Sequence, residues 1–206
     1  MELFSIGHSN HTIGRFIELL NIHKISAIAD VRSSPYSRFS EDFNQDILRE
    51  HLQKEGIKYV FLGKQLGART KNKDCYVEGK AIYEKIASTD EFISGINRLK
   101  KGLEKYRISV MCAEKDPLTC HRAILVCRYM KGDDVAINHI LGNGNIESHT
   151  QLERRMLSSR GMIKGEQECG VQLSLLPNIV VCEQDSLLQE AYRLHGNKIA
   201  YTQNKK

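Results

Sequence analysis

The chain has 206 residues, of which 41% are hydrophobic and 27% are charged, and this ordinary globular composition excludes collagen-like, low-complexity and fully disordered proteins. With 30 basic and 25 acidic side chains, the net charge of +5 is too small to indicate a nucleic-acid-binding protein by itself. No uncharged run approaches the roughly 18 apolar residues of a membrane span, and the start lacks the pattern of a secretory signal. We therefore expect a cytoplasmic protein without a membrane partner.

Short apolar runs that alternate with helical segments point to the fold. Buried strands are predicted at residues 3–7, 26–31, 58–62, 107–112 and 134–140. Helices are predicted after Thr12 and at residues 44–55, 80–87, 91–105 and 120–131. Such strands pair in parallel and need cover on both faces. The sequence therefore predicts an α/β fold with three layers, a mostly parallel sheet and helices on both faces, of the doubly wound type.

The character of the sequence changes near residue 160. We expect residues 1–160 to form one α/β domain and residues 161–206 to form a C-terminal extension. Within the extension, residues 161–170 have the composition of a linker and residues 185–196 are typical of a short helix. The closing YTQNKK is expected to be frayed.

Reactive side chains recur where the predicted strands end. His8 and Ser9 follow the first strand, Asp30 and Arg32 the second, Cys112 and Glu114 the fourth, and His139 lies at the end of the fifth. In open parallel sheets the carboxyl ends of the strands form the ligand-binding crevice. The pattern therefore predicts an active site at this edge of the sheet.

The segment CAEKDPLTCHR, residues 112–122, carries the strongest chemical indication. It runs from a strand through a loop into a helix whose first turn holds Cys120, His121 and Arg122, and a helix start favours anions. The same field, together with Arg122, would lower the pKa of Cys120 and favour its thiolate, while Glu114 could act as a general base. The alternative is that both cysteines only pack and that Asp116 and Thr119 only cap the helix.

Six cysteines, at positions 75, 112, 120, 127, 169 and 182, are expected to be reduced thiols. No C-x-x-C pair is present, so no metal site is assigned and the cofactor stays unknown. A transition metal bound by Cys112, Cys120 and His121, with His139 or His149, is left open as an alternative. His149 also fits a merely structural place, because Thr150 and Glu153 have capping-box spacing.

The loop between Lys64 and Lys80 is basic, and Tyr76 and Tyr83 lie within or near it. Such a loop can grip a phosphate backbone, although a solvated surface loop has the same composition.

Several segments together resemble the family known as domain of unknown function 488. They are SIGHSNHT (5–12), ADVRSSPYSRFSEDFN (29–44), FLGKQLGAR (61–69), CAEKDPLTCHR (112–122) and NHILGNGNIESHTQLERRML (138–157). The resemblance covers about the first 160 residues and implies an α/β domain with a polar cleft, without supplying a reaction. Its motif positions fall on His8, Ser9, Asp30, Arg32, Pro35, Ser37, Arg38, Cys112, Glu114, Cys120, His121, Arg122, His139 and His149.

A second, local resemblance lies in the extension. Gln172, Leu173, Leu175 and Leu176 form part of a QLSLL pentapeptide similar to the peptide that docks bacterial replication and repair proteins on the sliding clamp. In such peptides a glutamine orients the segment and spaced apolar side chains enter preformed pockets. Leu176 stands where phenylalanine is preferred.

Together these observations favour an enzyme that acts on a phosphate-bearing substrate, either a nucleotide or a nucleic acid, and the expected mechanism is thiol-dependent. The expected catalytic residues are Cys112, Glu114, Cys120, His121, His8 and Asp30. The expected substrate-binding residues are Ser9, Arg32, Arg38, Arg122, His139 and His149. The alternative is a non-catalytic module that binds nucleotide or DNA and is recruited to replication or repair through the clamp peptide.

Overall fold

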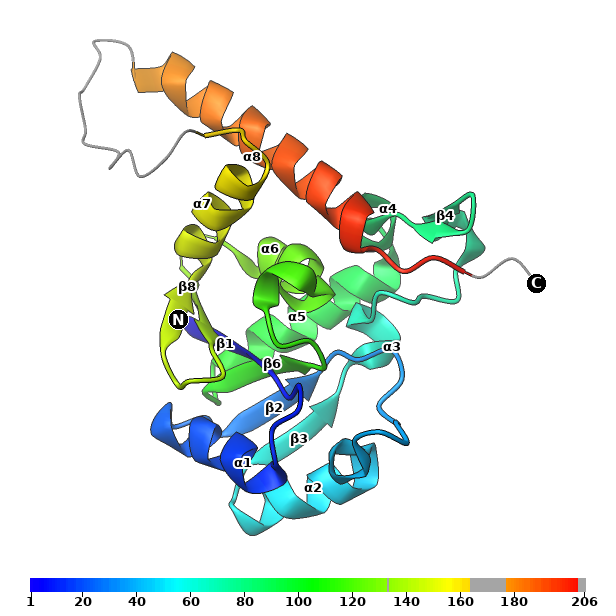
Figure 1. Ribbon diagram of the computed structural model, residues 1–206, viewed down its shortest axis with the longest axis vertical. Coiled ribbons are helices and arrows are strands. Elements are labelled where there is room, and N and C mark those ends of the chain that lie inside the picture. The colour runs from blue at the N-terminus through cyan, green and yellow to red at the C-terminus, as the bar shows by residue number, and fades with distance from the viewer. Residues whose placement is uncertain (133, 164–176, 204–206) are drawn as a thin grey trace.

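A six-stranded sheet forms the centre of the protein in a computed structural model (Figure 1). The structure describes residues 1–132, 134–163 and 177–203, and for residues 177–184 it describes the backbone only. The strand order is β3-β2-β6-β1-β7-β8. The strands are β1 (Glu2–Gly7), β2 (Ala27–Asp30), β3 (Lys58–Phe61), β6 (Ile108–Cys112), β7 (Ala136–Ile140) and β8 (Ile146–Ser148). The first five are parallel and match the five predicted strands, whereas β8 is antiparallel to β7 and was not predicted.

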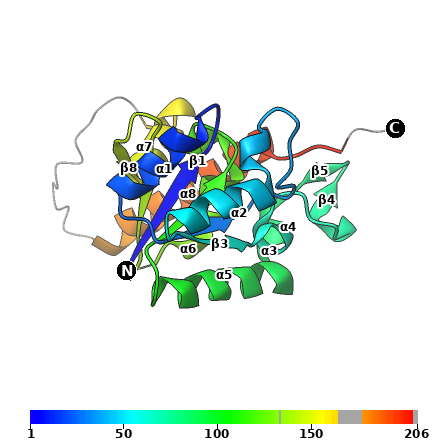
Figure 2. The ribbon, with the colours of Figure 1, turned by 90° about the horizontal axis from the view of Figure 1, so that it is seen from below.

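Helices cover both faces of the sheet, which confirms the three-layer α/β fold. On one face α1 (Ile13–Ile22) and α2 (Gln45–Lys54) pack on Phe4, Ile28 and Met111. The opposite face carries α5 (Asp90–Leu103) and a π-helical segment, Arg122–Cys127, that continues into α6 (Arg128–Met130). Figure 2 shows α2 and α5 on opposite sides of the sheet. The remaining helices are α3 (Gly63–Leu66), α4 (Tyr83–Ala87), α7 (His149–Ser159) and α8 (Pro177–Ile199).

Local sequence features explain several element ends. Thr12 caps α1, because its side chain accepts a hydrogen bond from the Arg15 backbone at 3.2 Å. Gly56 follows α2 with φ +72°, the left-handed conformation that suits glycine. The predicted capping box at Thr150 is wrong by two residues: the reciprocal bonds at the start of α7 join Ser148 and Gln151.

The described part of the C-terminal extension is packed on the domain. Helix α8 is longer than the predicted helix and runs across α7 and the π-helical segment toward α4 (Figure 1). Residues 201–203 are paired with the domain, so this part of the closing YTQNKK is not frayed as expected, and its last three residues lie outside the described part of the chain. Ala81 donates to the Tyr201 carbonyl at 2.9 Å, and Thr202 pairs with Lys80 of the small hairpin formed by β4 (Tyr76–Val77) and β5 (Lys80–Ala81).

No helix within the described ranges is long and apolar enough to cross a membrane.

Candidate functional site at the carboxyl ends of the strands

Two thiols, a carboxylate and an imidazole converge where β6 ends. Cys112 is the last residue of β6, and Cys120 and His121 return to it after a short loop that carries Glu114. The Cys120 sulfur lies 2.8 Å from Glu114 Oε2, and the Cys112 sulfur lies 3.6 Å from His121 Nδ1. One donor atom from each of the four residues lies within 4.8 Å of the others. Four of the predicted site residues thus lie together in the structure, and we call this group the Cys/Glu/His cluster.

The orientation of His121 is fixed by the main chain. Its Nε2 lies 3.0 Å from the carbonyl oxygen of Val31, and a carbonyl can only accept. The Nε2 atom therefore carries a hydrogen, and in the neutral ring Nδ1 is the free lone pair that faces Cys112.

The pKa values of the two thiols in the cluster are shifted in opposite directions. Burial raises the pKa of Cys120, but a hydrogen bond with Cys112 and the positive charge of Arg122 act against it and hold that pKa well below its usual range. The hydrogen bond with Cys120, followed by burial, raises the pKa of Cys112. Burial and then Cys120 raise the pKa of Glu114. Of the two thiols, Cys120 is therefore the one that loses its proton more readily.

Arg122 supports the loop that carries Glu114. Its guanidinium is fully buried and donates to the backbone carbonyls of Glu114, at 2.6 Å, and Lys115, at 3.2 Å. A Cβ atom at Gly7 would lie 1.9 Å from the Glu114 carbonyl oxygen, so only glycine allows β1 to approach this loop. Arg122 was expected to bind the substrate. Its guanidinium has no exposed surface, so Arg122 positions this loop instead of contacting a substrate.

The Cys/Glu/His cluster opens into a cleft of about 390 Å³. Cys112, Glu114 and His121 belong to its lining, whereas Cys120 lies behind them. Arg32 contributes a cation to the same lining and is held by Asp30 through a pair of 2.6 Å between Nη2 and Oδ2. Asp30 is fully buried, so it positions Arg32 rather than meeting a substrate.

Part of the cleft lining was not predicted from the sequence as a site. Arg69, Ile199 and Tyr201 line the cleft, and the Arg69 guanidinium lies 4.5 Å from the centre of the Tyr201 ring. Arg69 belongs to the basic loop noted in the sequence, but the C-terminal residues carried no local indication. Their place depends on the pairing of the tail with β5, a contact between segments far apart in the chain.

Three further predicted residues, in addition to Asp30, Cys120 and Arg122, lie outside this lining. His8 is buried with its ring stacked 4.4 Å from that of Phe43, and burial followed by Arg32 lowers its pKa to about 4. Ser9 donates a 3.1 Å hydrogen bond to Asn10, its neighbour in the chain. Arg38 is exposed on the loop after β2 and is not among the residues around the cleft.

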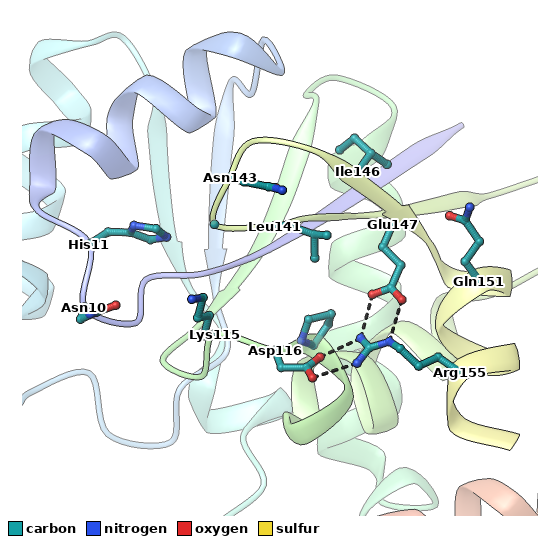
Figure 3. A pocket seen from close by; sticks show the side chains of 12 residues that line it. Asn10, His11, Lys115, Asp116, Leu141, Asn143, Ile146, Glu147, Gln151 and Arg155 are labelled. Carbon is teal, nitrogen blue, oxygen red and sulfur yellow. Dashed lines mark hydrogen bonds and ion pairs between the residues drawn. The ribbon is translucent and has the colours of Figure 1, made fainter. Parts of the chain in front are cut away.

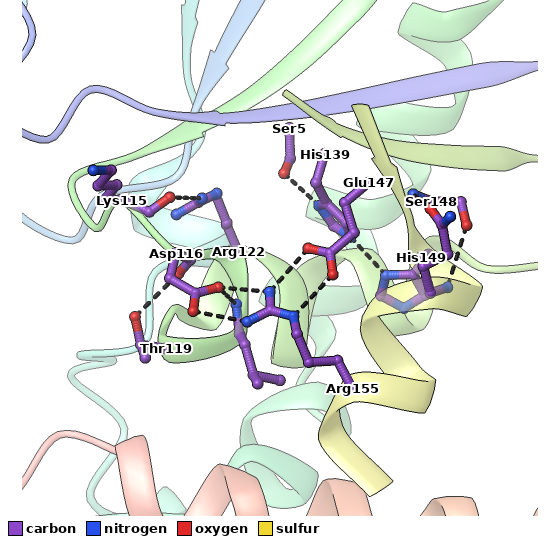
Figure 4. A network of polar contacts seen from close by, with 12 residues as sticks. Ser5, Lys115, Asp116, Thr119, Arg122, His139, Glu147, Ser148, His149 and Arg155 are labelled. Atoms are coloured by element: carbon purple, nitrogen blue, oxygen red, sulfur yellow. Dashed lines mark hydrogen bonds and ion pairs between the residues drawn. The ribbon is translucent and has the colours of Figure 1, made fainter. Parts of the chain in front are cut away.

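His139 and His149 belong to a separate buried network (Figure 4). Ser5 Oγ lies 2.7 Å from His139 Nδ1, and His139 Nε2 lies 2.9 Å from His149 Nδ1. The remaining nitrogen of His149 lies 2.8 Å from the Tyr192 hydroxyl of α8, which also donates to Glu153 at 2.8 Å. All four ring nitrogens are thus used inside the core, so these residues are placed to join β1, β7, α7 and α8 rather than to bind a substrate or share a metal with the cluster.

A second and larger cleft, of about 860 Å³, is lined by Lys115 and Asp116, the residues that follow Glu114 in the same loop (Figure 3). Arg155 spans its floor with double hydrogen bonds of 2.8–2.9 Å to both Asp116 and Glu147. Its lining contains no thiol, and its two carboxylates are already paired. The smaller cleft is therefore the better candidate for an active site, because the reactive groups of the cluster line it.

Some predicted residues cannot be placed. Gln172, Leu173, Leu175 and Leu176 of the clamp-like peptide lie outside the described residues, as does Cys169, and the side chain of Cys182 is likewise not described. Cys75, Cys112, Cys120 and Cys127 are free thiols.

The fold and the cluster define a three-layer α/β protein with a thiol-containing site at the carboxyl ends of its parallel strands. Within that class, the chain belongs to the family described as "Domain of unknown function DUF488", whose sequence model matches residues 12–129, more than half of the chain. The match includes the 112–122 segment that carries the cluster. No curated protein and no solved structure shows significant similarity to the chain.

Proposed function

We propose that the protein is an enzyme that acts on a phosphate-bearing substrate, a nucleotide or a nucleic acid, in the cleft beside the Cys/Glu/His cluster. One observation carries this proposal: the cluster opens into the same cleft as Arg32 and Arg69. A substrate held by the two arginines would lie against Cys112, Glu114 and His121. The proposal therefore separates anchoring, by the arginines, from chemistry, by the cluster.

The two arginines suit phosphate for different reasons. Arg32 is oriented by its bonds to Asp30 and by a 2.8 Å hydrogen bond to the Phe43 carbonyl, so little side-chain entropy is lost when it binds an anion. Arg69 is exposed and stacks on Tyr201, which leaves its donors available. Arg69 can bind phosphate through two parallel hydrogen bonds, and Arg32, whose Nε and Nη2 are engaged by Asp30 and Phe43, offers its Nη1 to an anion.

Aromatic rings on the same lining support a nucleotide as the phosphate-bearing group. Tyr36 is 55% exposed, and Tyr201 is partly exposed beside Arg69. Bases stack on such rings with little regard to sequence, at about 1–3 kcal/mol for each base. A nucleotide would thus place its phosphate on the arginines and its base on a tyrosine.

A comparison of binding with and without the phosphate group tests this proposal. We expect a nucleoside 5′-monophosphate to bind about tenfold more tightly than its nucleoside, because one charge-assisted hydrogen bond contributes about 1.5–3 kcal/mol. Arg69→Gln should remove most of this difference, and Lys101→Gln, which changes an exposed cation on α5, should not. Equal affinity for the two ligands across a panel of bases would contradict the proposal.

A further inference from the structure

The donor atoms of the Cys/Glu/His cluster stand near the spacing of a metal site. A tetrahedral zinc ion holds sulfur at about 2.3 Å and nitrogen or oxygen at about 2.0–2.2 Å, so its ligand atoms stand about 3.3–3.8 Å apart. The 3.6 Å between Cys112 Sγ and His121 Nδ1 lies within this range, whereas the 2.8 Å between Cys120 Sγ and Glu114 Oε2 is shorter, as for a hydrogen bond. With all four donor atoms within 4.8 Å of one another, small rotations of the side chains would bring them onto one ion.

The surroundings of His121 are those of a metal ligand. A histidine that binds metal almost always donates its other ring N–H to a carbonyl or carboxylate, which fixes the ring and directs the lone pair. Here Nε2 donates to the Val31 carbonyl at 3.0 Å, and Nδ1 faces the sulfurs. The backbone of Val31, just after β2, thus holds the imidazole in the orientation that a cation between Cys112 and Cys120 requires.

The sulfur of Cys120 has support of the same kind. The backbone N–H of Arg122 donates to it at 3.4 Å, within hydrogen-bonding range for sulfur. Such N–H···S contacts stabilise a thiolate ligand from outside the coordination sphere. Cys120 itself is 1% exposed and lies behind the cleft, where a buried ligand is more easily accommodated than an attacking nucleophile.

We propose that Cys112, Glu114, Cys120 and His121 bind one Zn²⁺ ion at the wall of the cleft. Two sulfurs and an imidazole favour zinc over magnesium or calcium, which prefer oxygen ligands. Glu114 is the ligand that reaches from the solvent side and is the one that water or substrate can replace. The inference rests on the proposed function in one respect only, that this cleft is the substrate site. It also changes the expected role of the cysteines: both sulfurs are metal ligands, and neither is the nucleophile expected from the sequence.

The bound ion would supply a Lewis acid beside Arg32 and Arg69, which fits a phosphate-bearing substrate. The chain's own residues would then hold that substrate, through the arginines, and fix the ligands, through Val31 and the Arg122 backbone. Zinc binding itself can be measured without any substrate, so its failure and the failure of the proposed function are separable.

Elemental analysis of the full chain tests this inference. The protein is purified without chelator or affinity metal, loaded with Zn²⁺ and freed of excess ion by dialysis. We expect one zinc per chain in the wild type and in Cys127→Ala, which removes a buried thiol outside the cluster, and less than a tenth of that in Cys112→Ser and Cys120→Ser. The inference would be overturned if the wild type held no zinc, or if both serine variants kept as much zinc as the wild type. It would also be overturned if the wild type bound another transition metal in an amount equal to its zinc.

A second measurement guards against variants that fail to fold. Wild-type protein loaded with Co²⁺ in place of zinc should show the visible absorption of a tetrahedral cobalt–thiolate site, which a surface-bound ion lacks. Glu114→Gln changes only the exposed ligand, and we expect it to weaken Zn²⁺ binding about tenfold or more while circular dichroism stays that of the wild type. Unchanged affinity in Glu114→Gln together with an octahedral cobalt spectrum would contradict the assigned ligand set.

Discussion

The buried guanidinium of Arg122 donates a 2.6 Å hydrogen bond to the backbone carbonyl of Glu114. A second bond, of 3.2 Å, reaches the carbonyl of Lys115, so one side chain holds the loop whose residues line both clefts. The carboxylate of Glu114 meets the Cys120 sulfur because its backbone is fixed in this way. The sequence pattern predicted that Arg122 binds an anion, whereas the structure makes it a positioning residue.

Replacement of Arg122 should therefore destabilise the fold. Arg122→Met removes two hydrogen bonds from a charged donor, and we expect a loss on the order of 3 kcal/mol in the free energy of unfolding, measured by urea denaturation. Arg193→Met is the matched control, because Arg193 is 53% exposed in its ion pair with Glu190 and should lose less than about 1 kcal/mol. Similar losses in the two variants would contradict the role given to Arg122.

The buried network around His149 predicts how stability depends on pH. Burial lowers the pKa of His149 from 6.5 to about 4, with Lys131 acting in the same direction and Glu153 opposing, while His139 and Tyr192 occupy its ring nitrogens. The unfolded chain binds more protons than the folded chain between these two pKa values, so stability falls as the pH drops below about 6.5. For this residue alone the loss between pH 7 and pH 5 should be about 2 kcal/mol.

Urea denaturation at the two pH values checks this expectation. His149→Gln cannot titrate, so its stability should fall by about 2 kcal/mol less than that of the wild type over the same interval. Nuclear magnetic resonance gives the direct comparison: a His149 ring that titrates near pH 6.5 in the folded protein would show the prediction to be wrong.

The sequence predicted the central sheet well and the site in part, for identifiable physical reasons. β1, β2, β6 and β7 are largely buried, so each is a short apolar run, and the edge strand β3 is half exposed but keeps the apolar residues Val60 and Phe61. β8, in contrast, has only three residues and two of them are polar. The cluster followed from the strand-end rule, because Cys112 and Cys120 are joined by one short loop. Arg69 and Tyr201 meet only through pairing between the tail and β5, which leaves no local pattern. His139 occupied a strand end in the sequence, yet its ring is fully buried beside Ser5.

Binding to a sliding clamp stays a prediction of the QLSLL peptide. The full chain should bind a bacterial clamp, and a Gln172→Ala, Leu175→Ala variant should bind at least about tenfold more weakly, since it removes the orienting amide and one apolar anchor. Surface plasmon resonance with immobilised clamp measures both. If wild type and variant bind equally well, or neither binds, the peptide is not a docking motif.

The central claim is that the cluster does chemistry on a phosphate-bearing substrate rather than merely lining a binding site. Its most direct test is a turnover assay in which zinc-loaded protein is incubated with nucleotides and oligonucleotides and the products are identified by mass spectrometry. We predict a new product with the wild type and with Cys127→Ala, and none with Cys120→Ser. Tight binding of nucleotides with no product from any of the three proteins would contradict the claim and favour a non-catalytic binding module.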